Sequence, residues 1–316
     1  MIDAHAHIHD AKFDIDREEM IARAREAGVR HIVTIGTSVE DSRRAIDLAR
    51  RFPDMLRASV AVHPHEYSKL PSEEIRREWM EELEVLARED IVAAIGECGL
   101  DYHAFGGEEV SSEQRSVQRE GFLEHIRLAE RIGKPLVIHA RESYEDVLEA
   151  LKDTDNGQWK TDNVSLTMEQ EGRIRQNLFP LQGRGIPFII LHCYQGDAEV
   201  TQRFLELSDE MAGKKNSRIN SRILFSFAGN VTYPVKKALR ETKGDPAESV
   251  RRIPLDRMLV ETDCPYLAPQ SRRGERNEPA FVAETARKIA EVKGVSLEEV
   301  ERGVEENFKN VFLNHE

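Results

Sequence analysis

Short runs of apolar residues rich in Val and Ile alternate with amphipathic segments along most of the chain. Eight runs predict β-strands over residues 2–8, 31–35, 56–62, 91–95, 136–138, 188–191, 223–227 and 258–260. Between them, apolar residues recur about three and four positions apart, which predicts helices over 17–27, 39–51, 72–88, 112–132, 144–152, 198–207 and 234–240. Strands that are apolar on both faces and alternate with helices predict an α/β fold, a closed parallel (β/α)8 barrel of the TIM type. Two closing helices are expected over 279–293 and 297–312.

Two stretches do not fit a compact barrel. Residues 153–184 are a long polar excursion before the sixth strand, and residues 212–222 are basic and turn-rich. Because the strand and helix alternation resumes after each, we interpret both as insertions into a single domain that spans 1–316. Each follows a helix, so we expect both to leave from the face opposite the carboxyl ends of the strands and to be dispensable for chemistry.

Composition and charge restrict the class of protein. Of 316 residues, 40% are hydrophobic and 33% charged, which is typical of a soluble globular protein. The 45 basic and 58 acidic residues give a net charge of −13, so a polyanionic substrate would need a local positive site. With neither a signal-peptide pattern nor a window of about 20 apolar residues, we expect a cytoplasmic location and no membrane contact. The three widely spaced cysteines suggest neither a disulfide framework nor a Cys-x-x-Cys zinc site.

Polar residues stand at the ends of several of the apolar runs. His5 and His7 lie in the first predicted strand, and the period of two in a strand directs both imidazoles to the same side. Others follow later strands, where barrel enzymes place their chemistry: Glu97, His139, His192 and Asp263. Four imidazoles and two carboxylates suit zinc, manganese or similar ions such as magnesium, and suffice for two of them.

Seven segments carry a resemblance to a known family. They read IDAHAHIHD at 2–10, VAVHPHE at 60–66, AIGECGLDYH at 94–103, PLVIHARES at 135–143, ILHCYQG at 190–196, LVETDCPYLAP at 259–269 and RRGERNEP at 272–279. Together they resemble the TatD family of metal-dependent deoxyribonucleases, a branch of the amidohydrolase-like barrels, over nearly the whole chain. The resemblance implies a TIM-type barrel, two divalent ions and phosphodiester hydrolysis.

The resemblance also implies roles for the six residues at the strand ends. By analogy Glu97 bridges two ions, His5 and His7 serve one, and His139 and His192 serve the other, with Asp263 as a further ligand. Two features depart from the family pattern. The gap of 53 residues between His139 and His192 is longer than usual, and HCYQG replaces an HCFSG-like segment, which bears on substrate access.

The expected mechanism is attack of a water that divalent ions activate. Two such ions and two carboxylates leave a net charge of about +2, enough to attract a phosphodiester locally. Asp263 is the candidate general base, with metal ligation alone as the alternative. Further candidates to contact substrate are His63, Tyr102, Arg141, Arg273 and Asn277. Alternatives remain for two of these: Arg141 in an ion pair with a loop carboxylate, and His63 as a turn residue beside Pro64.

We therefore expect a metal-dependent deoxyribonuclease, acting as an exonuclease on DNA ends, that is a monomer or a weak oligomer. Two alternatives stay open. The same barrel suits a metal-dependent deacylase of D-aminoacyl-tRNA, or another ester or amide hydrolase, and a non-catalytic binding protein is a third possibility. Outside the site, His31, His125 and His315 are expected to lie at the surface.

Overall fold

Eight parallel strands form one sheet whose spatial order is the order along the chain. The computed structural model describes residues 1–104, 108–155, 185–213, 221–234 and 246–313. The strands are β1 (Ile2–Ala6), β2 (His31–Ile35), β3 (Leu56–Val60), β4 (Val92–Asp101), β5 (Leu136–Arg141), β6 (Phe188–Leu191), β7 (Arg222–Phe227) and β8 (Met258–Val260). All eight predicted strands are confirmed. The carboxyl ends of β4 and β5 run further than predicted, because Cys98 to Asp101 pair with Ile138 to Arg141.

The sheet closes into a barrel through contacts between β1 and the segment after β8. The Asp263 amide donates to the His5 carbonyl oxygen at 2.9 Å, and the His7 amide donates to that of Cys264 at 2.8 Å. Below them the buried carboxylate of Asp3 accepts hydrogen bonds from the amide and hydroxyl of Thr262, at 2.9 and 2.6 Å. Burial raises the pKa of Asp3 to about 8. The ends of the first and last strands are therefore held together from inside the barrel.

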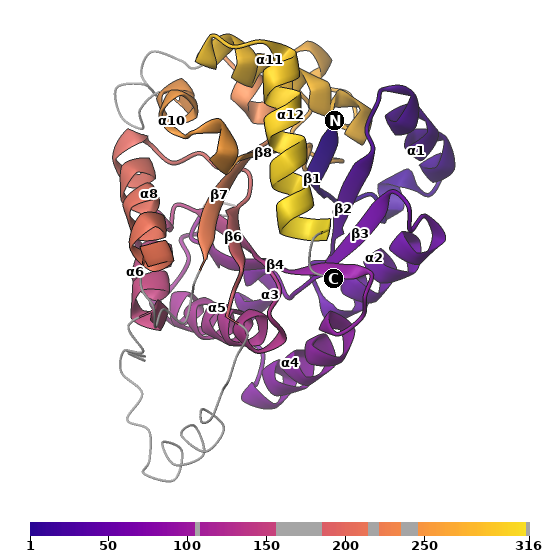
Figure 1. Cartoon of the computed structure of the whole chain (residues 1–316). Helices are drawn as coiled ribbons and strands as arrows, with labels where there is room; N and C mark the ends of the chain where they lie inside the picture. Colours follow the sequence, from indigo (N-terminus) through magenta and orange to yellow (C-terminus); the bar gives the residue numbers. More distant parts are fainter. Residues whose placement is uncertain (105–107, 156–184, 214–220, 235–245, 314–316) are drawn as a thin grey trace.

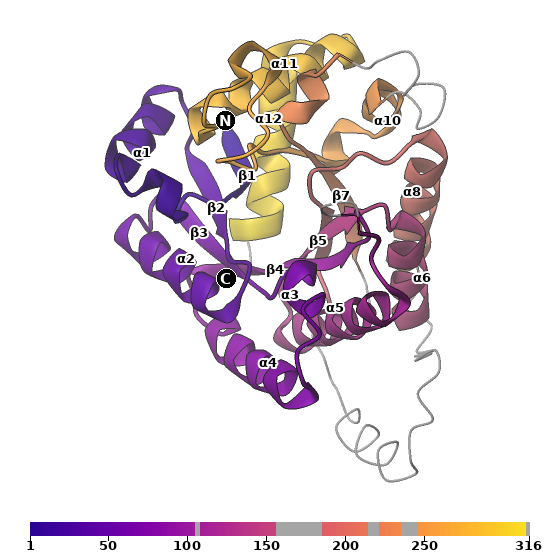
Figure 2. The same ribbon diagram turned by 180° about the vertical axis from the view of Figure 1, so that it is seen from behind.

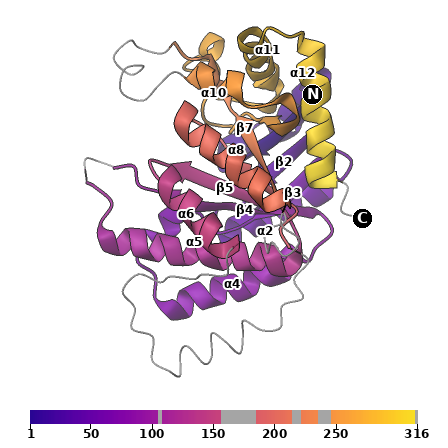
Figure 3. The same ribbon diagram turned by 60° about the vertical axis from the view of Figure 1, so that its left-hand side comes forward.

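Helices surround the strands, and their inner faces bury aliphatic side chains against the sheet. They are α1 (Arg17–Glu26), α2 (Val39–Arg51), α3 (Pro64–Tyr67), α4 (Glu73–Ala87), α5 (Ser112–Ile132), α6 (Tyr144–Asp155), α8 (Ala198–Gly213), α10 (Pro246–Arg252), α11 (Val282–Lys293) and α12 (Leu297–Phe308). Figure 3 shows α10, α11 and α12 at one end of the molecule, with α4 and α5 packed together at the other. No helix in the described part of the chain is long and apolar enough to cross a membrane.

Helix boundaries follow local capping chemistry. Ser38, Ser72, Ser111 and Ser296 each accept a backbone N–H of the first turn that follows, so each is the N-cap residue of its helix. The predicted insertion 153–184 is shorter at its start, because α6 continues to Asp155, and residues 156–184 lie outside the described ranges. The predicted insertion 212–222 is also shorter, because α8 continues to Gly213 and β7 begins at Arg222. The predicted helix 234–240 lies outside the described residues, except for Pro234.

The amino-terminal end of the barrel is covered by α12 and the turn that follows it, Lys309–Leu313. The Asn307 side chain donates to the carbonyl oxygens of Leu255 and Met258 where β8 begins, and Phe308 stacks on His31 at the start of β2. Figure 1 shows α12 in front of the strands, and Figure 2 shows it behind them from the opposite side. The open end of the barrel is therefore the one where the strands have their carboxyl ends.

His125 is not at the surface, which corrects the sequence-based expectation. Its ring is fully buried on α5, with Nδ1 at 2.7 Å from the carbonyl oxygen of Gly121 and Nε2 accepting the Val62 amide at 3.1 Å. The carbonyl can only accept, so Nδ1 carries the proton. His31 is half-buried, and His315 lies outside the described residues. His125 thus connects α5 to Val62, which follows β3 and directly precedes His63.

We expect the stability that His125 provides to disappear in mild acid. Burial lowers the pKa of His125 to about 4, whereas an exposed histidine has a pKa near 6.5. The unfolded chain therefore takes up this proton first, and the fold loses up to about 3 kcal/mol from this group as pH falls from 6.5 to 4. Urea unfolding should show wild type more stable than His125→Gln by about 2 kcal/mol at neutral pH, with the difference shrinking toward pH 4. A difference independent of pH would contradict the assignment.

Candidate metal centre

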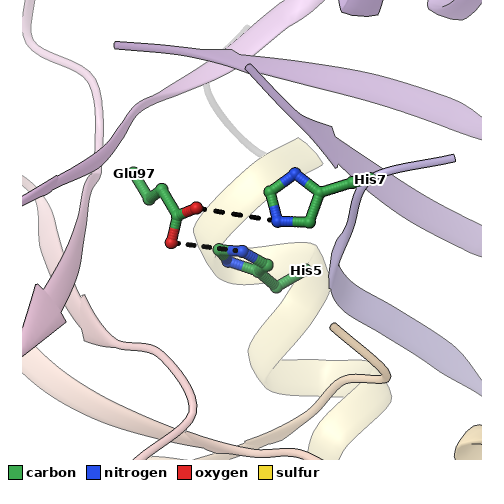
Figure 4. A group of neighbouring side chains, drawn as sticks. All are labelled: His5, His7 and Glu97. Atoms are coloured by element: carbon green, nitrogen blue, oxygen red, sulfur yellow. Dashed lines mark ion pairs between the residues drawn. The ribbon is translucent and has the colours of Figure 1, made fainter. Parts of the chain in front are cut away.

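The first strand directs two imidazoles into the barrel. Ile2, Ala4 and Ala6 alternate with Asp3, His5 and His7, so the polar side chains share the inner face. The Nδ1 of His7 donates to the carbonyl oxygen of Ile35 at 2.9 Å, which leaves its Nε2 free to accept. Both Nε2 atoms face Glu97: His5 lies 3.6 Å from one carboxylate oxygen and His7 lies 3.6 Å from the other (Figure 4).

Glu97 reaches this position through an irregularity in β4. Three steps along β4, from Ile95 to Cys98, oppose two steps along β5, from Leu136 to Ile138, as in a β-bulge. Gly99 has a φ of +138°, and a Cβ there would come within 2.1 Å of the carbonyl oxygen of His139. Only glycine permits this close approach of the two strands. The G-E-C-G sequence therefore presents the Glu97 carboxylate at the centre of the barrel mouth.

The Glu97 carboxylate is buried and surrounded by imidazoles. One of its oxygens lies 2.8 Å from Nε2 of His192 and 3.6 Å from Nδ1 of His139. Burial alone would raise the pKa of Glu97, but the neighbouring histidines, His192 first, hold it well below its usual value. Burial also keeps the pKa of His5 well below the ordinary histidine value. The centre therefore combines an ionised carboxylate with a neutral imidazole that can donate a lone pair.

Asp263 completes the group beside β1. Its Oδ1 lies 3.7 Å from Nε2 of His5 and 3.5 Å from Nε2 of His7. Asp263 has a φ of +56°, a left-handed conformation that Asp and Asn tolerate better than other side chains that carry a Cβ. The turn after β8 thereby directs this carboxylate back toward the first strand.

Two carboxylates that the sequence analysis missed lie behind the imidazoles of β5 and β6. Asp101 accepts from Nε2 of His139 at 3.1 Å and from Nε2 of His65 at 2.9 Å. Glu261 is fully buried, and its Oε1 accepts the Cys193 amide and lies 3.4 Å from Nδ1 of His192. Both could have been found by periodicity, because Asp101 lies four residues after Glu97 and Glu261 lies two residues before Asp263. Each positions the outer nitrogen of one imidazole.

His63 also belongs to this group. Ligand atoms of His63, Glu97 and His139 lie within 4.8 Å of one another, as do those of His5, His7 and Glu97, and those of His5, His192 and Asp263. The His63 ring stands 4.6 Å from that of His139, while its Nδ1 accepts the His65 amide at the start of α3. His63 therefore closes the turn beside Pro64 and also lies next to the candidate metal ligands, so the two interpretations of this residue are compatible.

The other residues predicted to contact substrate differ in placement. Asn277 is fully buried and uses its amide on the backbone, donating to the carbonyl oxygens of Thr262 and Tyr266. Tyr102 donates its hydroxyl to Asp146 at 2.7 Å. Arg141 is exposed at the end of β5, and Arg273 is exposed with its guanidinium over the Tyr233 ring.

The residues present fit divalent ions. Within the described part of the chain, both ring nitrogens of His5, Nδ1 of His192 and Oε2 of Glu261 are buried without a hydrogen-bond partner. Such atoms are rare in folded proteins and cost about 1–3 kcal/mol each. If the outer nitrogens of His139 and His192 carry their protons toward Asp101 and Glu261, their inner nitrogens and Glu97 present only lone pairs to one another. A metal cation placed among these lone pairs would satisfy all of them at once.

The cysteines lie beside this group without completing it. Cys98 and Cys264 are fully buried, where a thiol packs as a small apolar side chain. Cys193 is half-buried with a φ of +45°, and its sulfur accepts from the Asn230 side chain at 3.6 Å. All three are free thiols.

Comparison with known proteins finds relatives that are similar in sequence and solved structures that are similar in fold. An uncharacterized metal-dependent hydrolase of Bacillus subtilis (strain 168), YabD, is 32% identical over 99% of this chain and 98% of its own length. The 3′-5′ ssDNA/RNA exonuclease TatD of Dickeya dadantii (strain 3937) is 28% identical over 99% of this chain and 97% of its own length. Among solved structures, the TatD homologue YJJV of Escherichia coli K12 superposes with a TM-score of 0.73 at 22% identity, covering 99% of this chain and 97% of that one.

The match to a family is continuous along the chain. The profile of TatD-related DNases aligns with residues 2–313, which include every residue of the centre described above. The chain therefore belongs to the TatD-related DNase family and is a metal-dependent hydrolase.

Proposed function

We propose that this protein is a deoxyribonuclease that hydrolyses phosphodiester bonds at the ends of DNA strands. The observation that carries the proposal is the gathering of five imidazoles and two carboxylates, Glu97 and Asp263, at the open end of the barrel. The relative from Dickeya dadantii, named as a 3′-5′ exonuclease of single-stranded DNA and RNA, supports a 3′ terminus as the point of attack.

Two divalent ions fit the ligand atoms. His5, His7 and Asp263 would hold one and His139 and His192 the other, while Glu97 faces both sets, with His63 next to the second. Bound ions of this kind stabilise negative charge on phosphoryl oxygens and make water a better nucleophile. Asp101 and Glu261 orient the imidazoles of the second set.

Asp263 is the proposed general base. Its carboxylate is the one of the two at the centre that is partly open to solvent, with 14% of its side chain exposed against 6% for Glu97. It can therefore accept a proton from a water that attacks phosphorus and pass it to solvent. Glu97 is enclosed by imidazoles and suits a purely electrostatic role.

The carboxylates around the candidate metal centre bear on how a negatively charged strand is attracted to it. Asp101 and Glu261 raise the number of carboxylates around the centre from two to four, so two divalent ions would be neutralised rather than left in excess. A strand would then be held by cationic side chains at the rim, where Arg141 and Arg273 are exposed.

The proposed substrate class can be tested against its main alternative in one experiment. A 3′-labelled single-stranded DNA and a D-aminoacyl-tRNA are each incubated with the Mn²⁺-reconstituted protein, with and without EDTA. We expect loss of the terminal nucleotide that EDTA abolishes and no deacylation beyond the uncatalysed rate. If the D-aminoacyl-tRNA were deacylated while the DNA stayed intact, the protein would be a deacylase and the nuclease proposal would be wrong.

Glu97→Gln should reduce metal binding more than any other single change at the centre. A neutral amide cannot offset the charge of two cations that it faces. We expect Mn²⁺ stoichiometry, measured by elemental analysis after gel filtration, to fall from two ions per chain to one or none, with DNA hydrolysis lost. Glu142→Gln, at the exposed end of β5, is the control and should keep both ions. A Glu97→Gln protein with two ions and full rate would remove Glu97 from this role.

Asp263→Asn should separate proton transfer from metal binding. Asn tolerates the left-handed backbone at this position and keeps one oxygen for ligation. We expect most of the metal to remain, while single-turnover cleavage at saturating Mn²⁺ slows by about 10²–10⁴-fold, the usual contribution of a general base. Metal content is measured on the same samples. Equal rates at equal metal content would leave Asp263 as a ligand only.

A further inference from the structure

An aromatic side chain stands exposed at the rim of the metal centre. Tyr266, three residues after Asp263, has 48% of its surface exposed, and its ring lies edge-on to His7 with centroids 6.2 Å apart. Among the described residues, the other large exposed hydrophobic side chains are aliphatic: Ile15, Leu70, Ile75 and Val85. Burying a ring of this size would gain about 2 kcal/mol, so its exposure beside a metal ligand indicates a surface kept for contact.

The backbone that carries Tyr266 is firmly held. Its amide donates to the carbonyl oxygen of Asp263 at 3.0 Å, and its own carbonyl oxygen accepts from Asn277 at 2.6 Å. The same Asn277 amide group donates to the carbonyl oxygen of Thr262, on the other side of Asp263. The backbone from which the ring projects is therefore fixed relative to Asp263 by a buried side chain, as in a preorganised binding group.

A cation lies over this ring. The Lys12 ammonium group is 4.3 Å from the centroid of Tyr266. Lys12 is exposed, and its amide is held by the carboxylate of Asp10 at 2.7 Å, at the start of the turn after β1. An ammonium group and an aromatic face side by side match the two parts of a nucleotide, because phosphate attracts the cation and a base stacks on the ring.

We propose that Tyr266 and Lys12 form a subsite for the terminal nucleotide of a single strand. The base stacks on the Tyr266 ring, and Lys12 leaves the ring to contact the backbone phosphate. This inference rests on the proposed nuclease function and names the side chains that would hold the terminal base and its phosphate. Lys12 would thereby join Arg141 and Arg273 as a cation at the rim, where the four carboxylates around the centre favour one.

Stacking is tested first by binding, without cleavage. A short DNA strand with 2-aminopurine at its 3′ end, joined by a non-hydrolysable linkage, is mixed with the Mn²⁺-reconstituted protein, and the fluorescence of the base is followed. We expect quenching with wild type and Tyr266→Phe, and about tenfold weaker binding with loss of quenching in Tyr266→Leu, given the usual energy of stacking on one aromatic ring. Val85→Ala, an exposed site on α4, is the control and should match wild type. Quenching that persists in Tyr266→Leu would overturn the proposal.

Cleavage then separates the base from the phosphate. Two strands are compared, identical except that one ends in an abasic residue. Wild type should have a lower KM for the strand with the base, and in Tyr266→Leu the ratio of the two KM values should approach one. Lys12→Gln should instead raise both KM values together and reduce their dependence on salt. A nuclease that shows no such ratio would refute the subsite alone, whereas a protein that cleaves neither strand would refute the nuclease function itself.

Discussion

The structure depends on a carboxylate placed inside a ring of imidazoles. Glu97 is removed from water at the mouth of the barrel, and burial of an unpaired carboxylate would cost several kcal/mol. Ring nitrogens of His5, His7, His139 and His192 lie 2.8–3.6 Å from its two oxygens, and a cation held between them would offset its charge. These histidines come from three strands, His5 and His7 from β1, His139 from β5 and His192 from the end of β6, so the centre exists only when the barrel has closed around it.

Strand irregularities bring these side chains to one point. The β1–β2 register slips between Asp3 and Ala6, around His5, and the β4–β5 register slips between Ile95 and Cys98, around Glu97. A regular barrel would direct inward side chains into stacked layers, whereas a bulge re-aims a single residue. The candidate metal centre is thus built from local departures from the same strand geometry that forms the core.

The strands and the ligand candidates were predictable, but their surroundings were not. Polar residues at the ends of apolar runs stand out in a sequence, and His5, His7, Glu97, His139, His192 and Asp263 were found in this way. His125 was misinterpreted, and the backbone contacts of Asn277 were not foreseen, because residue type and helical spacing do not reveal which side chain meets a backbone group of another element. Bulges are equally hidden, since the extra residue in β4 is defined only by its pairing with β5.

Buried polar side chains from outside the barrel hold the ends of the strands. His125 of α5 accepts the Val62 amide next to His63, and Asn277 holds the carbonyl oxygens on both sides of Asp263. The segment of Asn277 is in turn tied to α1, where Arg276 pairs with Asp16, and Glu278 with Arg23. Because these contacts fix the backbone, side chains that point outward from the same turns, such as Tyr266, can differ without moving a ligand. Substrate preference can therefore change at the rim while the metal centre stays the same.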